Sequence, residues 1–231
     1  MELAEGIHYI GGTKGGWVRA FLVEDGRDLT LIDTLYEEDP RVVMEEIRRL
    51  GRSASDLKRI VLTHGHRAHL GGLAALKRWS GATVFSHEWE ADIIAGNRKA
   101  QPVSIVPRRP LRVYIPFQLG LALGFGAHPG CPVDKTLKEE DEVGTLQVLH
   151  TPGHSPGHLS FYSPERSVLI SGDAIATWPR FEAGWPAFTL NSKQHRASIR
   201  RLAALEARVV GVGHGDPITA NAAERVHSLE A

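Results

Sequence analysis

The sequence predicts a layered α/β fold with two strand-rich halves. Segments rich in β-branched and aromatic residues alternate with segments whose apolar residues have helical spacing, and this alternation occurs in both halves of the chain. The 231 residues suit one domain, and the content of 42% hydrophobic and 23% charged residues is ordinary for a globular protein. A domain of this size buries about 70–75% of its unfolded-chain surface, so we expect a core that needs no disulfide.

The first half begins with strands. We expect strands at Ile7–Ile10, Trp17–Val23 and Leu29–Ile32, with a hairpin turn at Asp25-Gly26. A helix should run from Pro40 to about Leu50, because proline favours the first helical position and Gly51 follows as a stop. The next predicted elements are a strand at Arg59–Leu62, a helix at Gly72–Trp79, a strand at Thr83–Ser86 and a helix at Glu88–Ala95.

The second half repeats the alternation from about residue 146. Strands are predicted at Leu146–His150, Leu159–Tyr162 and Val168–Ile170. A helix containing Ile199, Leu202, Ala203 and Leu205 should precede a strand at Val209–Val212, and a last helix should follow Pro217.

The segment 98–132 differs from both halves. It carries six prolines, five lysine or arginine residues and no acid, and its apolar stretch has no clear period. We interpret it as an insertion or lid within a single domain spanning residues 1–231. Its composition suits an apolar substrate with a carboxylate, a membrane surface, a homodimer contact or a loop packed on its own domain.

The composition narrows the class of protein. Lys plus Arg and Asp plus Glu are both 27, and a net charge of zero argues against a nucleic-acid binder. The single cysteine, Cys131, excludes an intrachain disulfide and a cysteine-based zinc finger. We predict no transmembrane segment, because no run approaches eighteen apolar residues. We also expect no secretory signal, and with the lone thiol this predicts a cytoplasmic location.

The twelve histidines are the unusual feature of the composition. His64, His66 and His69 lie within six residues, between a predicted strand and a predicted helix. His154, Asp173 and His214 each follow another predicted strand. Imidazole is the commonest protein ligand for metals, and strand ends are where α/β folds build their sites. The pattern therefore predicts a metal pocket.

With these motifs the chain resembles the metallo-β-lactamase superfamily. Residues 64–69 align with its HxHxDH motif, and His154, Asp173 and His214 match its later histidine, bridging aspartate and last histidine. Asp33 matches the early aspartate that supports the metal loop. The resemblance implies a four-layer αββα sandwich, in which two mixed β-sheets are flanked by helices. It also implies six metal ligands: His64, His66, His69, His154, Asp173 and His214.

One residue departs from the family's motif. Ala68 stands where the resemblance requires an aspartate that ligates the second metal. We therefore expect one tight zinc site, formed by His64, His66 and His154 with Asp173 in reach, and a second site that is weakened or absent. Iron or manganese could replace zinc. Asp173 is then the remaining residue to orient an attacking water.

The resemblance implies a metal-dependent hydrolase that attacks an ester, lactone, thioester or amide of a small molecule, through water activated by the metal. Two alternatives stay open: a mono-iron oxygenase on the same fold, and a non-catalytic ligand-binding protein that has lost activity with the aspartate. His87, Trp178, Trp185 and Phe188 are candidates for the substrate pocket, although the aromatic residues could equally belong to the core. His158 is expected to have a hydrogen-bonded structural role.

Overall fold

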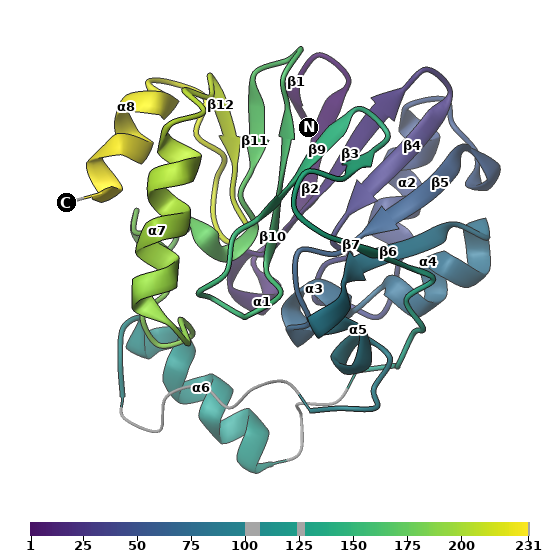
Figure 1. Ribbon diagram of the computed structural model, residues 1–231. Coiled ribbons are helices and arrows are strands. Elements are labelled where there is room, and N and C mark those ends of the chain that lie inside the picture. Colours follow the sequence, from purple (N-terminus) through teal and green to yellow (C-terminus); the bar gives the residue numbers. More distant parts are fainter. Residues whose placement is uncertain (100–106, 124–127, 231) are drawn as a thin grey trace.

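The computed structural model describes residues 1–99, 107–123 and 128–230, and its strands form two β-sheets (Figure 1). The first sheet contains, side by side in chain order, β1 (Glu2–Ala4), β2 (Ile7–Gly11), β3 (Arg19–Asp25), β4 (Asp28–Ile32), β5 (Leu57–Val61), β6 (Thr83–His87) and β7 (Lys135–Leu137). The second sheet contains, in spatial order, β12 (Val209–Gly211), β11 (Val168–Ile170), β10 (Leu159–Ser163), β9 (Leu146–His150) and β8 (Glu142–Val143). Strands β4 to β7 are parallel, as are β11 and β12, whereas the other neighbours are antiparallel. Both sheets are therefore mixed.

Helices flank the two sheets and cross one end of the sandwich (Figure 1). The helices are α1 (Lys14–Trp17), α2 (Arg41–Arg49), α3 (Arg67–Leu70), α4 (Leu73–Ser80), α5 (Glu88–Ile94), α6 (Leu111–Ala122), α7 (Ser192–Ala203) and α8 (Ala222–His227). Short 3₁₀ turns span Ala54–Asp56, Gly172–Ala174 and Ser228–Glu230. In the part of the chain that the structure describes, no helix has the length and apolar character needed to cross a bilayer.

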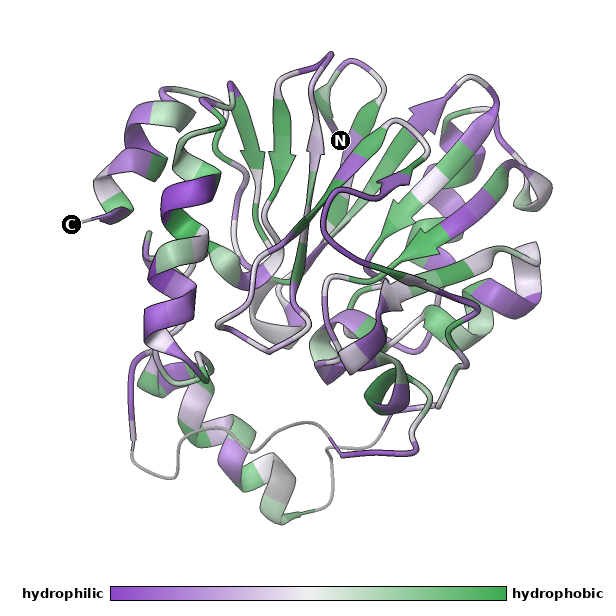
Figure 2. Cartoon of the chain, viewed as in Figure 1, coloured by the Kyte–Doolittle hydropathy of each residue, from purple (hydrophilic) through white to green (hydrophobic). Residues whose placement is uncertain are grey.

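Three apolar clusters separate the four layers, because side chains alternate between the two faces of each strand. In β3, Phe21 and Val23 point between the sheets, whereas Leu22 points to the helices on the outer face. In β11, Ile170 points between the sheets and Leu169 towards α7 and α8. The strands therefore read as apolar on both faces, and Figure 2 shows this in their hydrophobic colouring. The αββα sandwich implied by the sequence is confirmed.

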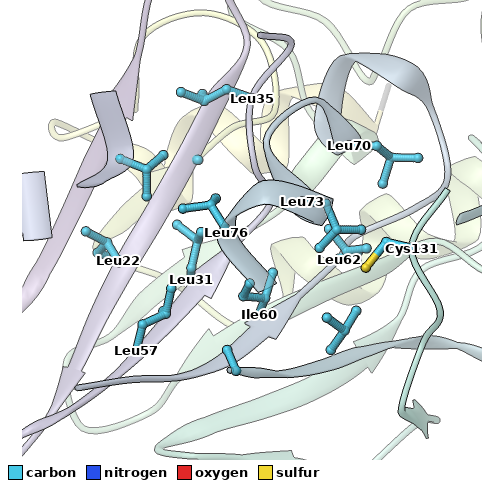
Figure 3. Close-up of a cluster of buried hydrophobic side chains, with 14 of the residues drawn as sticks. Leu22, Leu31, Leu35, Leu57, Ile60, Leu62, Leu70, Leu73, Leu76 and Cys131 are labelled. Atoms are coloured by element: carbon cyan, nitrogen blue, oxygen red, sulfur yellow. The ribbon is translucent and has the colours of Figure 1, made fainter. Parts of the chain in front are cut away.

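A cluster of buried side chains packs α2 and α4 against the first sheet (Figure 3). Leu31 and Ile60, on neighbouring parallel strands, pack against Leu73 and Leu76 of α4 and have no exposed surface. Cys131 belongs to the same cluster as a buried free thiol. Burial of that thiol raises its pKa, which agrees with a packing role.

The predicted elements of both halves are present, with ends shifted by a few residues. At Trp17 the prediction of a strand was wrong, because this residue ends α1 with a φ of 61° and β3 begins at Arg19. Within the predicted insertion 98–132, the structure has the helix α6, while residues 100–106 and 124–127 lie outside the described residues. The sequence did not predict α6 because Pro116 lies inside this helix and because apolar residues on both of its faces hide the helical spacing. That the whole chain is one domain stays a prediction.

Candidate metal centre

The centre lies where parallel strands end side by side. β4 and β5 pair so that Ile32 is opposite Val61, and the chain continues from them into Asp33 and Thr63. In the second sheet, β11 and β12 end together in the same way, ahead of Asp173 and His214. Ligands from distant parts of the sequence therefore converge because the carboxyl ends of parallel strands share one edge of a sheet.

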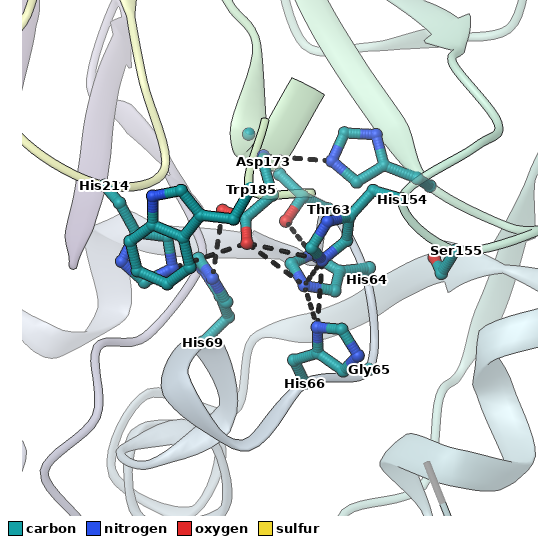
Figure 4. A network of polar contacts seen from close by, with 12 residues as sticks. Thr63, His64, Gly65, His66, His69, His154, Ser155, Asp173, Trp185 and His214 are labelled. Carbon is teal, nitrogen blue, oxygen red and sulfur yellow. Dashed lines mark hydrogen bonds and ion pairs between the residues drawn. The ribbon is translucent and has the colours of Figure 1, made fainter. Parts of the chain in front are cut away.

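Three imidazole nitrogens meet on one side of the centre (Figure 4). His154 Nε2 lies 2.9 Å from His66 Nδ1 and 3.2 Å from His64 Nε2, and the latter two atoms are 3.0 Å apart. Nitrogens that bind one tetrahedral zinc at about 2.0–2.1 Å are about 3.3 Å from each other, so this spacing is close to that of a zinc site. Asp173 Oδ2 lies 3.3 Å from His154 Nε2 and can complete the group.

The charge state of these histidines suits metal binding. Burial lowers the pKa of His64 and His154 well below the usual range, and it lowers the pKa of His66 to about 4. At neutral pH the three side chains are therefore neutral imidazoles, the form that ligates a metal. For Asp173, burial would raise the pKa, but the imidazoles of His214 and His69 outweigh it and hold the pKa of the carboxyl well below its usual range.

A second group shares Asp173. His214 Nε2 lies 3.3 Å from Asp173 Oδ2, and His69 Nε2 lies 3.3 Å from Asp173 Oδ1. Among the described residues, His69 Nε2 and Asp173 Oδ1 are buried without a hydrogen-bond partner, although such atoms are normally satisfied. A metal ion would satisfy both atoms, so the residues present fit a second ion as well. Ala68, partly buried beside the core, adds no ligand to this group.

Neighbouring residues fix the orientation of the ligands. Asp33 accepts hydrogen bonds from the backbone and the hydroxyl of Thr63 and lies 2.9 Å from His69 Nδ1. Burial would lower the pKa of His69, but the Asp173 and Asp33 carboxylates outweigh it and raise the pKa to about 10. His214 donates from Nδ1 to the carbonyl of Gly16, at 2.8 Å, which leaves its Nε2 as the atom that faces Asp173.

His158 has the structural role expected from the sequence. Its Nε2 accepts a hydrogen bond from the backbone N–H of Asp173 at 3.1 Å, so its Nδ1 carries the proton and faces the Thr151 hydroxyl. His158 therefore holds the segment that carries Asp173. Gly213 is needed nearby, because a Cβ there would overlap Asp173 Oδ1.

Glu90, which is not among the residues predicted for the site, joins the two histidine loops. This buried carboxylate of α5 accepts hydrogen bonds from the backbone of Gly65 at 3.0 Å and of Gly157 at 3.1 Å, and from the hydroxyl of Ser155 at 2.5 Å. It thus ties the loop of His64 and His66 to the loop of His154. A signal was present, because an acid three residues before Ile93 lies on the apolar face of the predicted helix.

Comparison with known proteins identifies the family. The sequence profile of the metallo-beta-lactamase superfamily matches residues 15–214, which include all six converging residues. The chain belongs to the metallo-beta-lactamase superfamily. The probable metallo-hydrolase YflN of Bacillus subtilis (strain 168) is 27% identical over 233 residues, covering 95% of this chain and 87% of that protein.

A more distant relative carries a specific enzyme name. Hydroxyacylglutathione hydrolase GloC of Haemophilus influenzae is 25% identical over 134 residues, which are 56% of this chain and 55% of that protein. Among solved structures, a metallo-beta-lactamase family protein of Thermus thermophilus has a TM-score of 0.69 at 28% identity, covering 99% of this chain and 79% of that one. The protein TTHA1623, solved in a di-iron-bound form, has a TM-score of 0.65 at 28% identity, covering 90% and 93% of the two chains.

Trp185 and Trp178 form an aromatic wall beside the second group of candidate ligands. Trp185 stacks on His214, with ring centroids 4.1 Å apart, and Trp178 contacts Trp185 at 6.0 Å. Phe188 lies behind Trp185 in a buried cluster with α6, so it is one ring further from the ligands. His87 caps α5 by accepting a hydrogen bond from Trp89 N–H, and it stacks on His150.

Proposed function

We propose that this protein is a metal-dependent hydrolase that cleaves an acyl bond of a small molecule: a thioester, ester, lactone or amide. The observation that carries the proposal is the pair of ligand groups that share Asp173, one with His64, His66 and His154 and the other with His69 and His214. The relatives named as a probable metallo-hydrolase and as a hydroxyacylglutathione hydrolase support the same reaction class.

The metal would supply Lewis acidity, both towards water and towards the oxygen of the attacked carbonyl. The protein's own part is to hold and orient. His64, His66 and His154 present neutral imidazoles, and Asp173 is the carboxylate in reach of both groups, where it stays ionised and can orient an attacking water. The stacked rings of His214 and Trp185 give the second group an apolar side that limits access of bulk water.

We further propose that zinc occupies the group of His64, His66 and His154 tightly, and that the other group holds a second ion weakly. The first group offers three imidazoles and a carboxylate, whereas the second offers two imidazoles and the shared carboxylate. A missing anionic ligand at position 68 lowers the charge that the second group offers to a cation.

Metal analysis tests the proposal most directly. Protein purified without chelator should contain close to one tightly held zinc per chain and should hydrolyse at least one compound in a panel of lactones, thioesters and β-lactams. The variant His66→Ala should lose both the metal and the activity while keeping its circular dichroism spectrum. Turnover by a metal-free His66→Ala protein would refute the assignment.

A mono-iron oxygenase is the second candidate; the di-iron-bound form of TTHA1623 supports iron as a metal for such a centre, although not the oxygenase reaction. Imidazoles with a carboxylate also suit iron. Iron found after aerobic purification, together with oxygen uptake in the presence of a substrate, would favour this reaction. Zinc content with hydrolysis and no oxygen uptake would exclude it.

A further inference from the structure

An open cavity lined by arginines lies beside the aromatic wall, and the candidate metal centre does not account for it. Its volume is about 530 Å³, within the range of ligand pockets. The lining residues are Arg109, Pro110, Leu111, Arg112, Pro179 and Arg180. They come from the start of α6 and from the loop after Trp178, two segments that are distant in the sequence but adjacent in the fold.

Hydrogen bonds connect both walls of this cavity to the metal centre. The backbone N–H groups of Thr177 and Trp178 donate to the carbonyl of His214, at 2.9 and 3.3 Å, and Pro179 follows directly. On the other wall, the carbonyl of Arg109 accepts a hydrogen bond from Ala187 N–H at 2.9 Å, two residues after Trp185. Trp185 itself donates from Nε1 to the carbonyl of Trp178 at 2.8 Å. The cavity is thus built onto the loops that carry the rings beside His214.

The charge around the cavity is unbalanced. Arg180 Nε lies 3.7 Å from Glu182 Oε2, and Arg109 also acts on this carboxylate. Within the described residues, no ion pair is formed by Arg112, and the residues that line the cavity include three arginines and no acid. The first backbone N–H groups of α6 add the positive end of a helix dipole. An anion in the cavity would relieve the repulsion between the arginines and would accept their hydrogen bonds.

We propose that this cavity binds the carboxylate or phosphate group of the substrate, so that the enzyme acts on acidic acyl compounds. The assignment of a substrate rests on the proposed hydrolase function, whereas the anion site itself does not. The acyl bond would lie at the metal centre and the anionic group at the arginines, with the partly exposed Trp178 against the part of the molecule between them. Neutral acyl compounds then lack one of the two contacts and bind more weakly.

Direct binding tests the anion site without catalysis. Succinate and inorganic phosphate are titrated separately into chelator-treated protein and followed by calorimetry and tryptophan fluorescence. Each of the variants Arg109→Gln and Arg112→Gln should weaken binding about fivefold, as expected for exposed ion pairs, and Arg112→Lys should weaken it less. The matched control is Arg108→Gln, which removes an exposed neighbouring arginine that does not line the cavity. Thermal unfolding checks that the variants are folded.

The two anions also distinguish the substrate class, since preference for succinate indicates a carboxylate and preference for phosphate a phosphoryl group. The proposal is overturned if neither anion binds at millimolar concentration, or if Arg109→Gln and Arg112→Gln both bind the anions as tightly as the control does.

Kinetics test the role of the site in catalysis. Thioesters of one acyl group with glutathione, which carries carboxylates, and with the neutral N-acetylcysteamine are compared. Arg109→Gln and Arg112→Gln should raise KM for the glutathione thioester alone and leave kcat within about twofold. Hydrolysis without any effect of the arginines would overturn the cavity proposal only. If anion binding depends on the arginines but no acyl compound is hydrolysed, the proposed hydrolase function is overturned and the anion site remains supported.

Discussion

His69 Nε2 and Asp173 Oδ1 face each other at 3.3 Å, both buried, and neither has a hydrogen-bond partner among the described residues. The other ring nitrogen of His69 is held by Asp33, so the ring cannot turn away from Asp173. Two candidate ligand atoms are therefore fixed in position, one of them on the residue that follows Ala68 in the chain. A carboxylate introduced at position 68 would add a further oxygen ligand to the group that contains these two atoms.

The variant Ala68→Asp should raise the affinity for a second metal equivalent at least about tenfold, because it adds an anionic ligand to a group that keeps His69, His214 and Asp173. Calorimetric titration of metal into chelator-treated protein measures this affinity. Ala68→Asn, which adds a neutral side chain of similar size, is the control. A large gain in hydrolysis by Ala68→Asp would also show that the unmodified chain is limited by this one position. Two equally tight equivalents in the unmodified chain would contradict the prediction.

The variant Glu90→Gln should raise the dissociation constant of the tight metal about tenfold. The amide NH₂ of a glutamine would face backbone N–H groups that now donate hydrogen bonds to the Glu90 carboxylate. The loops of His66 and His154 would then lose hydrogen bonds that hold them to the same side chain. Competition with a chromophoric chelator measures the change. Glu88→Gln, an exposed acid on the same helix, is the matched control and should behave like the unmodified chain. Equal metal affinities for the two variants would refute the positioning role.

The metal-free protein should lose stability as the pH falls from about 6.5 to 5. Burial lowers the pKa of His66 to about 4 and of His158 to about 3, and it also lowers the pKa of His64 and His154. In this pH window the unfolded chain therefore binds protons that the folded chain does not, so the free energy of unfolding increases with pH. The raised pKa of His69 acts in the opposite direction, as its contribution is complete below pH 6.5 and is lost as the pH rises through about 10.

Urea unfolding of chelator-treated protein at several pH values checks this dependence. The variant His158→Gln should show a shallower rise between about pH 5 and 6.5, because it removes one of the groups. A free energy of unfolding that stays constant across this range would contradict the prediction.

Leu31→Ala should lower the free energy of unfolding by about 2–5 kcal/mol, because Leu31 is fully buried between the first sheet and α4. Val42→Ala on the exposed face of α2 is the control and should change it by less than about 0.5 kcal/mol. Chemical denaturation measures both values. If both variants lower the free energy of unfolding by a similarly small amount, the cluster contributes less to stability than expected.

Much of the fold could be predicted because its elements have strong local patterns. The strand Val168–Ile170 and the helix at Glu88–Ile94 are recognisable from a few residues each. The two-residue strand β8 has too little sequence to form a pattern, and α6 is apolar on both faces and contains Pro116. The functions that the sequence suggested for the segment 98–132, among them a homodimer contact, stay predictions, as do the cytoplasmic location and the lack of nucleic-acid binding.

The sequence by itself determined the kinds of candidate ligand and their spacing, because three histidines within residues 64–69 and single histidine or aspartate residues after later strands are local features. Only the tertiary structure decided which atoms meet. It brings Asp173 between His69 and His154, joins Glu90 to loops 25 and 65 residues away, and places Arg112 beside Arg180. These relationships depend on strand pairing and packing between distant segments. A local sequence pattern therefore does not predict which buried donor will face which acceptor.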